Sequence, residues 1–218
     1  KVTDAAGNDG ATATQAYVLD TTAPTTTIGT IDISADNGTS ATDFLTDTAA
    51  QTITATLSAG LATGEILYGS IDNGANWIDI TTSVSDTTAV SWTTGATLAG
   101  TSSIAFKVTD AAGNDGATAT QAYVLDTTAP TVSISMDDTA LVTGETTTVT
   151  FTFSEAVSGF TLDDISEAGT GSLSSLDTSD NIIYTATYTP TASSTKAINV
   201  ITVDKTGVTD AAGNAGVG

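Results

Sequence analysis

The sequence contains no cysteine and no histidine, and because all four basic residues are lysines, arginine is also absent. No disulfide can form, and stability must come from apolar cores, bound ions or neighbouring domains. No guanidinium is present to clamp a carboxylate or a phosphate. Most catalytic arrangements need histidine, cysteine or arginine, so we predict that the protein is not an enzyme. A hydrolase with two catalytic carboxylates is the enzymatic alternative.

Positive charge is scarce, with 4 lysines against 25 acidic residues and a formal net charge of −21. Such a chain repels phosphate backbones and anionic lipid surfaces, and we expect it to bind no nucleic acid. No stretch approaches the roughly 18 consecutive apolar residues of a membrane span, and no signal-peptide pattern opens the sequence. Direct membrane insertion is therefore not expected.

Charged residues are also few in total, at 13%, whereas hydrophobic residues make up 39% of the 218 positions. Disordered acidic chains are usually poor in apolar residues, so this composition indicates a folded chain. The length allows one or two domains of ordinary size.

A long internal repeat determines the domain organisation. Residues 1–25 recur unchanged at 107–131, an offset of 107 − 1 = 106 residues, and a shorter copy lies at 208–216. A period near 100 residues is longer than the roughly 20–50 residues of a solenoid repeat and matches a small β-sandwich. The chain is therefore predicted to be an array of similar domains.

The repeated segment ends in Asp-Thr-Thr-Ala-Pro at 20–24 and at 126–130, where proline disfavours a preceding helix and stiffens the chain. We place the boundaries there. Residues 1–24 are the last strand and linker of a preceding repeat, residues 25–130 are the first unit, and residues 131–218 are the second unit, without its last strand. The chain resembles a window of a longer array. Alternatively, a neighbouring chain supplies the absent strand by strand addition.

Apolar residues alternate with threonine in several segments. Ile53, Ala55 and Leu57 share one face of a predicted strand, and Val149, Phe151 and Phe153 do the same in the second unit. Asn-Gly pairs supply turns, and no helical period is present. About seven short strands per unit favour an all-β fold of tandem immunoglobulin-like β-sandwich domains. In the first unit we expect strands near 25–33, 51–58, 65–72, 76–82, 88–93, 103–109 and 117–126.

The second unit, in its segments 148–157, 184–190 and 208–214, closely resembles the bacterial Ig-like tandem repeats of giant cell-surface adhesins of the RTX type. Residues 33–44 of the first unit resemble another repeat from such proteins. The resemblance implies a non-catalytic extracellular spacer on the bacterial cell surface, often stiffened by calcium. Its partners would be adjacent Ig-like repeats of the same or a neighbouring chain.

Calcium is the predicted cofactor. In an Ig-like sandwich the last hairpin loop, the start of the first strand and the loop after the second strand share one pole. Oxygen ligands without histidine or cysteine suit Ca²⁺ better than zinc or copper. The predicted ligands are Asp20, Glu65, Asp110 and Asn114 at the first joint, and Asp126, Glu155, Asp210 and Asn214 at the second.

Asp36 and Asp43, at the opposite pole of the first unit, are predicted either to reach the next unit or to hold a separate ion. An ordinary structural alternative applies to all these positions, since Asp and Asn in turns commonly bond their own backbone amides. No EF-hand pattern is present.

Residues 70–77 match the S-x-D-x-G-x-x-W hairpin known from sialidases, but the absence of arginine favours a structural hairpin in which Asp72 bonds turn amides. Trp77 and Trp92 either pack in the sandwich or form a platform for a sugar ring. A glycan- or protein-binding module is therefore the alternative function. The unchanged 25-residue repeat favours the spacer.

Overall fold

The computed structural model describes residues 1–167, 171–191 and 200–216. Its regular structure there is β throughout, apart from two 3-10 turns, η1 (Thr81–Ser83) and η2 (Leu162–Asp164). The first unit holds β1 (Asp32–Ile33), β2 (Leu45–Thr46), β3 (Ile53–Thr56), β4 (Ile66–Ser70), β5 (Ile78–Asp79), β6 (Val84–Ser85), β7 (Ala89–Trp92), β8 (Thr101–Thr109) and β9 (Ala119–Leu125). The second holds β10 (Val132–Met136), β11 (Thr147–Phe153), β12 (Ile165–Glu167), β13 (Gly171–Thr178), β14 (Ile183–Pro190) and β15 (Ile201–Val203).

The first unit is a sandwich of two sheets, with strand orders β1-β3-β7-β6 and β2-β9-β8-β4-β5. The period-two pattern explains the core, because β3 alternates buried Ile53 and Ala55 with exposed threonines. Trp92 of one sheet meets Phe106 of the other edge to face, with ring centroids 5.9 Å apart. The all-β, Ig-like prediction is confirmed.

The second unit has a four-stranded sheet, β10-β11-β14-β13, and a two-stranded sheet, β12-β15. Val149, Phe151 and Phe153 of β11 all face the core, as the alternation predicts. Phe160 packs edge to face against Phe153 and against Tyr184 of β14, each with a centroid distance of 5.0 Å. The core residues of the two units form two separate clusters.

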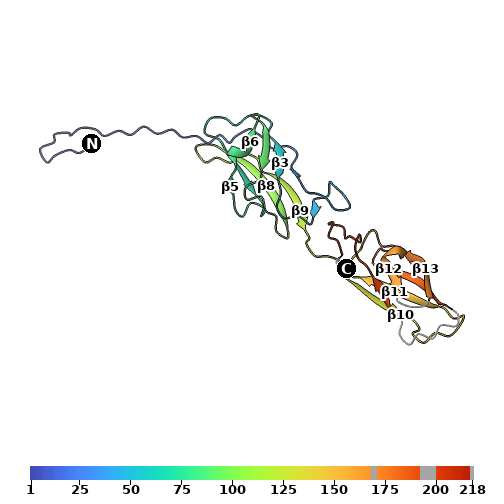
Figure 1. Cartoon of the computed structure of the whole chain (residues 1–218). Helices are drawn as coiled ribbons and strands as arrows, with labels where there is room; N and C mark the ends of the chain where they lie inside the picture. The colour runs from blue at the N-terminus through green and yellow to red at the C-terminus, as the bar shows by residue number, and fades with distance from the viewer. Residues whose placement is uncertain (168–170, 192–199, 217–218) are drawn as a thin grey trace.

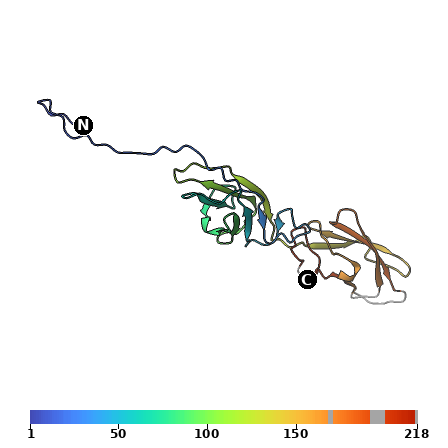
Figure 2. The same cartoon turned by 90° about the horizontal axis from the view of Figure 1, so that it is seen from above.

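The two units lie end to end, and residues 1–24 extend away from the first unit (Figures 1 and 2). The short strand β2 pairs in parallel with the end of β9, through Leu45 with Val124 and Thr46 with Leu125. This pairing holds the loop before β2 beside the linker that leaves β9. Both segments therefore reach the joint between the units.

Candidate metal centre at the joint between the units

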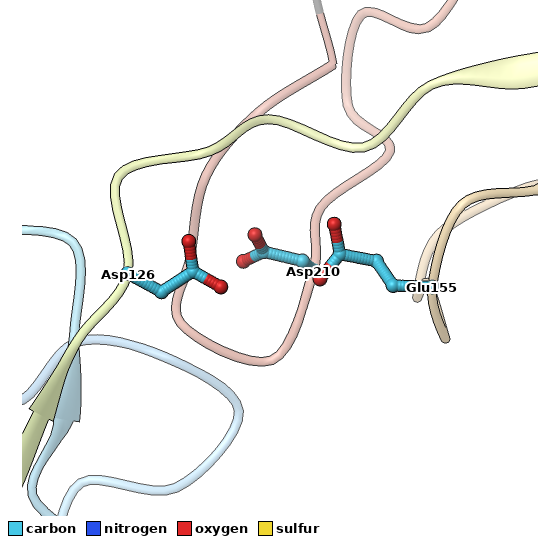
Figure 3. A group of neighbouring side chains, drawn as sticks. All are labelled: Asp126, Glu155 and Asp210. Carbon is cyan, nitrogen blue, oxygen red and sulfur yellow. The ribbon is translucent and has the colours of Figure 1, made fainter. Parts of the chain in front are cut away.

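Three carboxylates meet at this joint. Asp126 directly follows β9, Glu155 lies just after β11, and Asp210 follows a bridge between Thr209 and Ser158. One carboxylate oxygen from each of the three lies within 4.8 Å of the other two. Figure 3 shows the side chains of Asp126 and Glu155 pointing toward Asp210 from opposite sides. The second predicted ligand set is thus brought together by segments distant in sequence.

Backbone contacts fix the position of Glu155 near the linker. Thr131, at the end of the linker, donates its amide to Ser154 Oγ at 3.0 Å and accepts the Ser154 amide at 2.9 Å. Glu155 is the next residue, so its carboxylate is carried to within reach of Asp126. The amide of Asp126 in turn donates to the Thr46 carbonyl at 2.9 Å, which ties the start of the linker to the first unit.

Asp210 is only 1% exposed and is held by its own loop. Its Oδ1 accepts the amides of Gly213 and Asn214, at 2.8 and 2.9 Å, and its Oδ2 accepts the Asn214 side-chain amide at 2.8 Å. The same Nδ2 of Asn214 donates to the backbone carbonyl of Asp126 at 2.9 Å. Asn214 therefore joins the linker to the loop through its amide nitrogen, and its predicted role as an oxygen ligand stays a prediction.

The charges at this site are all negative. Burial raises the pKa of Glu155, and the neighbouring charges of Asp210 and Asp126 raise it further. Glu155 accepts no hydrogen bond from any residue that the structure describes. The ion pairs found among those residues, Lys1 with Asp9 and Lys107 with Asp115, lie elsewhere. A hard cation would match this set of oxygen atoms and relieve their repulsion.

The predicted ligands at the first joint come together only in part. Asp110 accepts the backbone amide of Asn114 at 2.9 Å and its side-chain nitrogen at 2.8 Å, as Asp210 does from Asn214. We call this pair of hydrogen bonds the aspartate clasp. Asn114 also donates to the Asp20 carbonyl, at 3.2 Å. Among the described residues, however, only the second joint gathers three acidic side chains. Asp20 is exposed, and Glu65 stays in its own loop, where it accepts the Ala62 amide at 2.8 Å.

Chain geometry explains the difference between the two glutamates. In the first unit the contact equivalent to Thr131 with Ser154 is made by Thr27 with Ser58. Glu65 lies seven residues beyond Ser58 and directly before β4, whereas Glu155 lies one residue beyond Ser154. The two glutamates are therefore not structural equivalents, although each follows the strand that pairs with the first strand of its unit, β3 for Glu65 and β11 for Glu155.

Asp36 and Asp43 lie together in the loop before β2. Asp36 Oδ2 accepts the Phe44 amide at 3.0 Å, and Asp43 Oδ1 accepts the Leu45 amide at 3.1 Å. The Asp36 Oδ1 atom is buried and has no partner among the described residues. Burial raises the pKa of Asp36, with smaller effects from the charges of Asp43 and Asp32. An ion at this pair stays a prediction.

The hairpin at residues 70–77 has the predicted structural role. Asp72 Oδ1 accepts Ser70 Oγ at 2.7 Å and the Asn76 amide at 2.8 Å, and hydrogen bonds, that from the Asn76 side chain first, lower the pKa of Asp72 to about 2. The sugar platform is not formed, because Trp92 is 1% exposed in the core. Trp77 instead packs under the ammonium group of Lys107, which lies 4.7 Å from its ring centroid.

Comparison with known proteins finds a match over the second unit. Residues 126–218 match the family model of a bacterial Ig-like domain, and this stretch contains all three carboxylates of the joint. Domains of this kind are generally non-catalytic and often lie at the cell surface. No curated protein and no solved structure matches the chain. None of the described residues belongs to a helix with the length and apolar character needed to cross a bilayer.

Proposed function

We propose that this chain is a non-catalytic extracellular spacer of a bacterial surface adhesin or filament, with calcium stiffening the joint between its units. One observation carries the proposal: Asp126, Glu155 and Asp210 converge from the linker and from two loops of the second unit, with no cationic side chain beside them among the described residues. The match to a bacterial Ig-like domain supports the spacer role.

The chemistry of the three side chains suits calcium. Ca²⁺ takes six to eight oxygen ligands at about 2.3–2.6 Å and accepts carboxylates in one- or two-oxygen modes. Three carboxylates offer up to six oxygen atoms, and water or turn carbonyls can complete the shell. Small adjustments would suffice to close the set around an ion, since the three oxygens already lie within 4.8 Å of one another.

The mechanical effect follows from where the ligands are attached. Asp126 belongs to the linker, whereas Glu155 and Asp210 belong to the body of the second unit. Bending at residues 126–131 would move Asp126 away from the other two and break coordination. Without the ion, repulsion among the carboxylates favours that bending. Calcium would therefore convert a hinge into a stiff joint, and many such joints would produce a rod.

The proposal concerns the second joint first. At the first joint, Glu65 would have to release the Ala62 amide before it could approach Asp20 and Asp110. Asp36 and Asp43 already bond amides of their own loop, so an ion there would have to compete with those bonds. We therefore assign calcium to Asp126, Glu155 and Asp210 and treat the other positions as weaker candidates.

The test is calorimetric titration of the 218-residue chain with Ca²⁺, together with small-angle X-ray scattering in calcium and in excess EGTA. We expect binding at the second joint with a dissociation constant of about 10⁻⁴–10⁻³ M, the range of extracellular calcium modules. Asp126→Asn should weaken this binding, and EGTA should shorten the maximum dimension of the wild-type chain. Absence of binding, with scattering unchanged by EGTA, would refute the proposal.

Association by strand addition is a second candidate, favoured by the exposure of residues that match β9. Tyr17 is 87% exposed, whereas Tyr123, at the matching position of β9, is 2% exposed. Residues 13–19, which have the sequence of β9, could therefore pair with an incomplete sandwich of another chain. If chains pair in this way, sedimentation velocity should show concentration-dependent association that Tyr17→Ser reduces. If the chain stays monomeric at all concentrations, association by strand addition is refuted, and the array of domains within one chain remains.

A further inference from the structure

A second contact between the units lies beside the carboxylates and is made by backbone atoms. The Thr39 amide of the first unit donates to the Ala211 carbonyl of the second at 3.0 Å. A Cβ atom added to Gly38 would lie 2.1 Å from the same carbonyl oxygen, and one added to Gly213 would lie 3.2 Å from the Asn37 carbonyl. The loop of residues 37–39 thus lies directly on the loop of residues 211–213, between the two bodies seen in Figure 1.

The first unit contains a loop of the same sequence, in which residues 111–113 are exposed. Residues 110–114 and 210–214 share the sequence Asp-Ala-Ala-Gly-Asn. Both loops have the aspartate clasp, and in both the asparagine side chain reaches a linker carbonyl. Their exposure nevertheless differs, because Ala212 is 1% exposed while Ala112 is exposed to solvent. The loop of residues 37–39 lies on residues 211–213, and among the described residues no corresponding loop lies on residues 111–113.

We propose that the surface formed by residues 111–113 is a docking site for the 37–39 loop of another repeat of the first-unit type. The Ala111 carbonyl would accept the amide at position 39, and the glycine at position 38 would allow the backbones to touch. Recognition by backbone atoms requires small residues at the contact, and the sequence provides Gly38 in one loop and Ala111, Ala112 and Gly113 in the other.

The identity of the occupant follows from the repeat and from the fold. Residues 1–24 are identical to 107–130, so the segment that enters the first unit has the sequence with which a first-type repeat ends. In such a repeat the pairing of β2 with β9 holds the 37–39 loop beside the outgoing linker. The loop would then face residues 111–113 of the next repeat. This inference rests on the proposed spacer function in one respect, since it requires repeats in tandem.

The absence of cysteine makes thiol labelling a direct test, because single-cysteine variants have no background. In the 218-residue chain, Ala112→Cys should react at least tenfold faster than Ala212→Cys. A lengthened chain with a second copy of residues 25–130 inserted before residue 25 reproduces the natural joint sequence. In that chain, the cysteine at position 112 of the original copy should react as slowly as Ala212→Cys. The equivalent cysteine in the inserted copy should remain fast.

Two glycine variants assign the protection to the loop. Gly38→Ala in the inserted copy should restore fast labelling at position 112, since its Cβ meets a backbone oxygen. Gly60→Ala is the matched control, because its Cβ would lie 3.4 Å from the nearest atom, an ordinary contact. Fast labelling at position 112 in the lengthened chain would overturn the proposal. In the 218-residue chain, Gly38→Ala should also speed the labelling of Ala212→Cys. If that labelling stays slow, the second unit alone buries the residue, and the proposal is overturned.

The labelling is run in calcium and in EGTA to separate this inference from the calcium proposal. Loop-dependent protection in EGTA would support docking even if no calcium binds. Calcium binding with unprotected cysteine at position 112 would remove the docking site and leave the calcium joint standing.

Discussion

Glu155→Gln is the sharpest perturbation of the joint, because it removes charge without breaking a hydrogen bond to any described residue. By contrast, Asp210 accepts three hydrogen bonds within its loop, and Asp126 accepts the Thr128 amide at 2.9 Å. Replacing either aspartate would therefore disturb the backbone as well as the charge. We expect Glu155→Gln to stabilise the chain in EGTA and to reduce the stabilisation that calcium supplies.

The magnitudes follow from the separations. Two unit charges 4.8 Å apart interact by roughly 3 kcal/mol at an effective dielectric constant of 20, but partly exposed pairs usually contribute about 0.2–1 kcal/mol. Removing two repulsive pairs should therefore stabilise the second unit by about 1 kcal/mol in EGTA. Calcium at ten times its dissociation constant adds roughly 1.4 kcal/mol to the wild type. A tenfold loss of affinity would reduce this gain to about 0.4 kcal/mol.

The assay is thermal unfolding in EGTA and in calcium. Both tryptophans lie in the first unit, so their fluorescence follows that unit, while circular dichroism follows both. A change of 1 kcal/mol corresponds to roughly 4–8 °C for a domain of 60–100 residues. Glu65→Gln is the matched control and should leave the calcium response of the second unit unchanged. An equal calcium gain in wild type and Glu155→Gln, or destabilisation by Glu155→Gln in EGTA, would refute the reasoning.

Three further predictions concern parts of the fold outside the joint. Phe160→Ala removes a ring that packs edge to face in the second core and should destabilise that unit by about 3–5 kcal/mol, measured by urea unfolding; a loss below about 1 kcal/mol would contradict the packing. Tyr123→Phe should cost the first unit about 1–2 kcal/mol by the same measurement, because the buried hydroxyl donates to the Ile71 carbonyl at 2.8 Å. The pKa of Asp72 is lowered from 3.8 to about 2, so its stabilising effect is complete above pH 3.8 and is lost as the pH falls through about 2; carboxyl NMR titration should give that midpoint, and one near 3.8 would show that the turn hydrogen bonds are absent.

The strands and their buried faces could be predicted from the sequence, because alternation with a period of two is a local property. The buried faces of β3 and β11 are those that the alternation indicates. The match of residues 126–218 to a bacterial Ig-like domain agrees with the motifs that carried the resemblance. The position of Glu65 could not be predicted, because Glu65 and Glu155 occupy similar places in the sequence and different places in the fold.

The aspartate clasp is a local structure that the sequence alone predicts. Asp4 with Asn8 forms it in residues 1–10, where no sandwich surrounds it, with the same hydrogen bonds as Asp110 with Asn114. Partners four residues apart in a Gly-containing turn need no tertiary support, so the clasp follows from the local sequence alone. Only the tertiary structure determines which distant residues contact the clasp. Glu155 reaches Asp210, and the 37–39 loop covers residues 211–213, because strand pairing and the length of the linker carry distant segments to one joint.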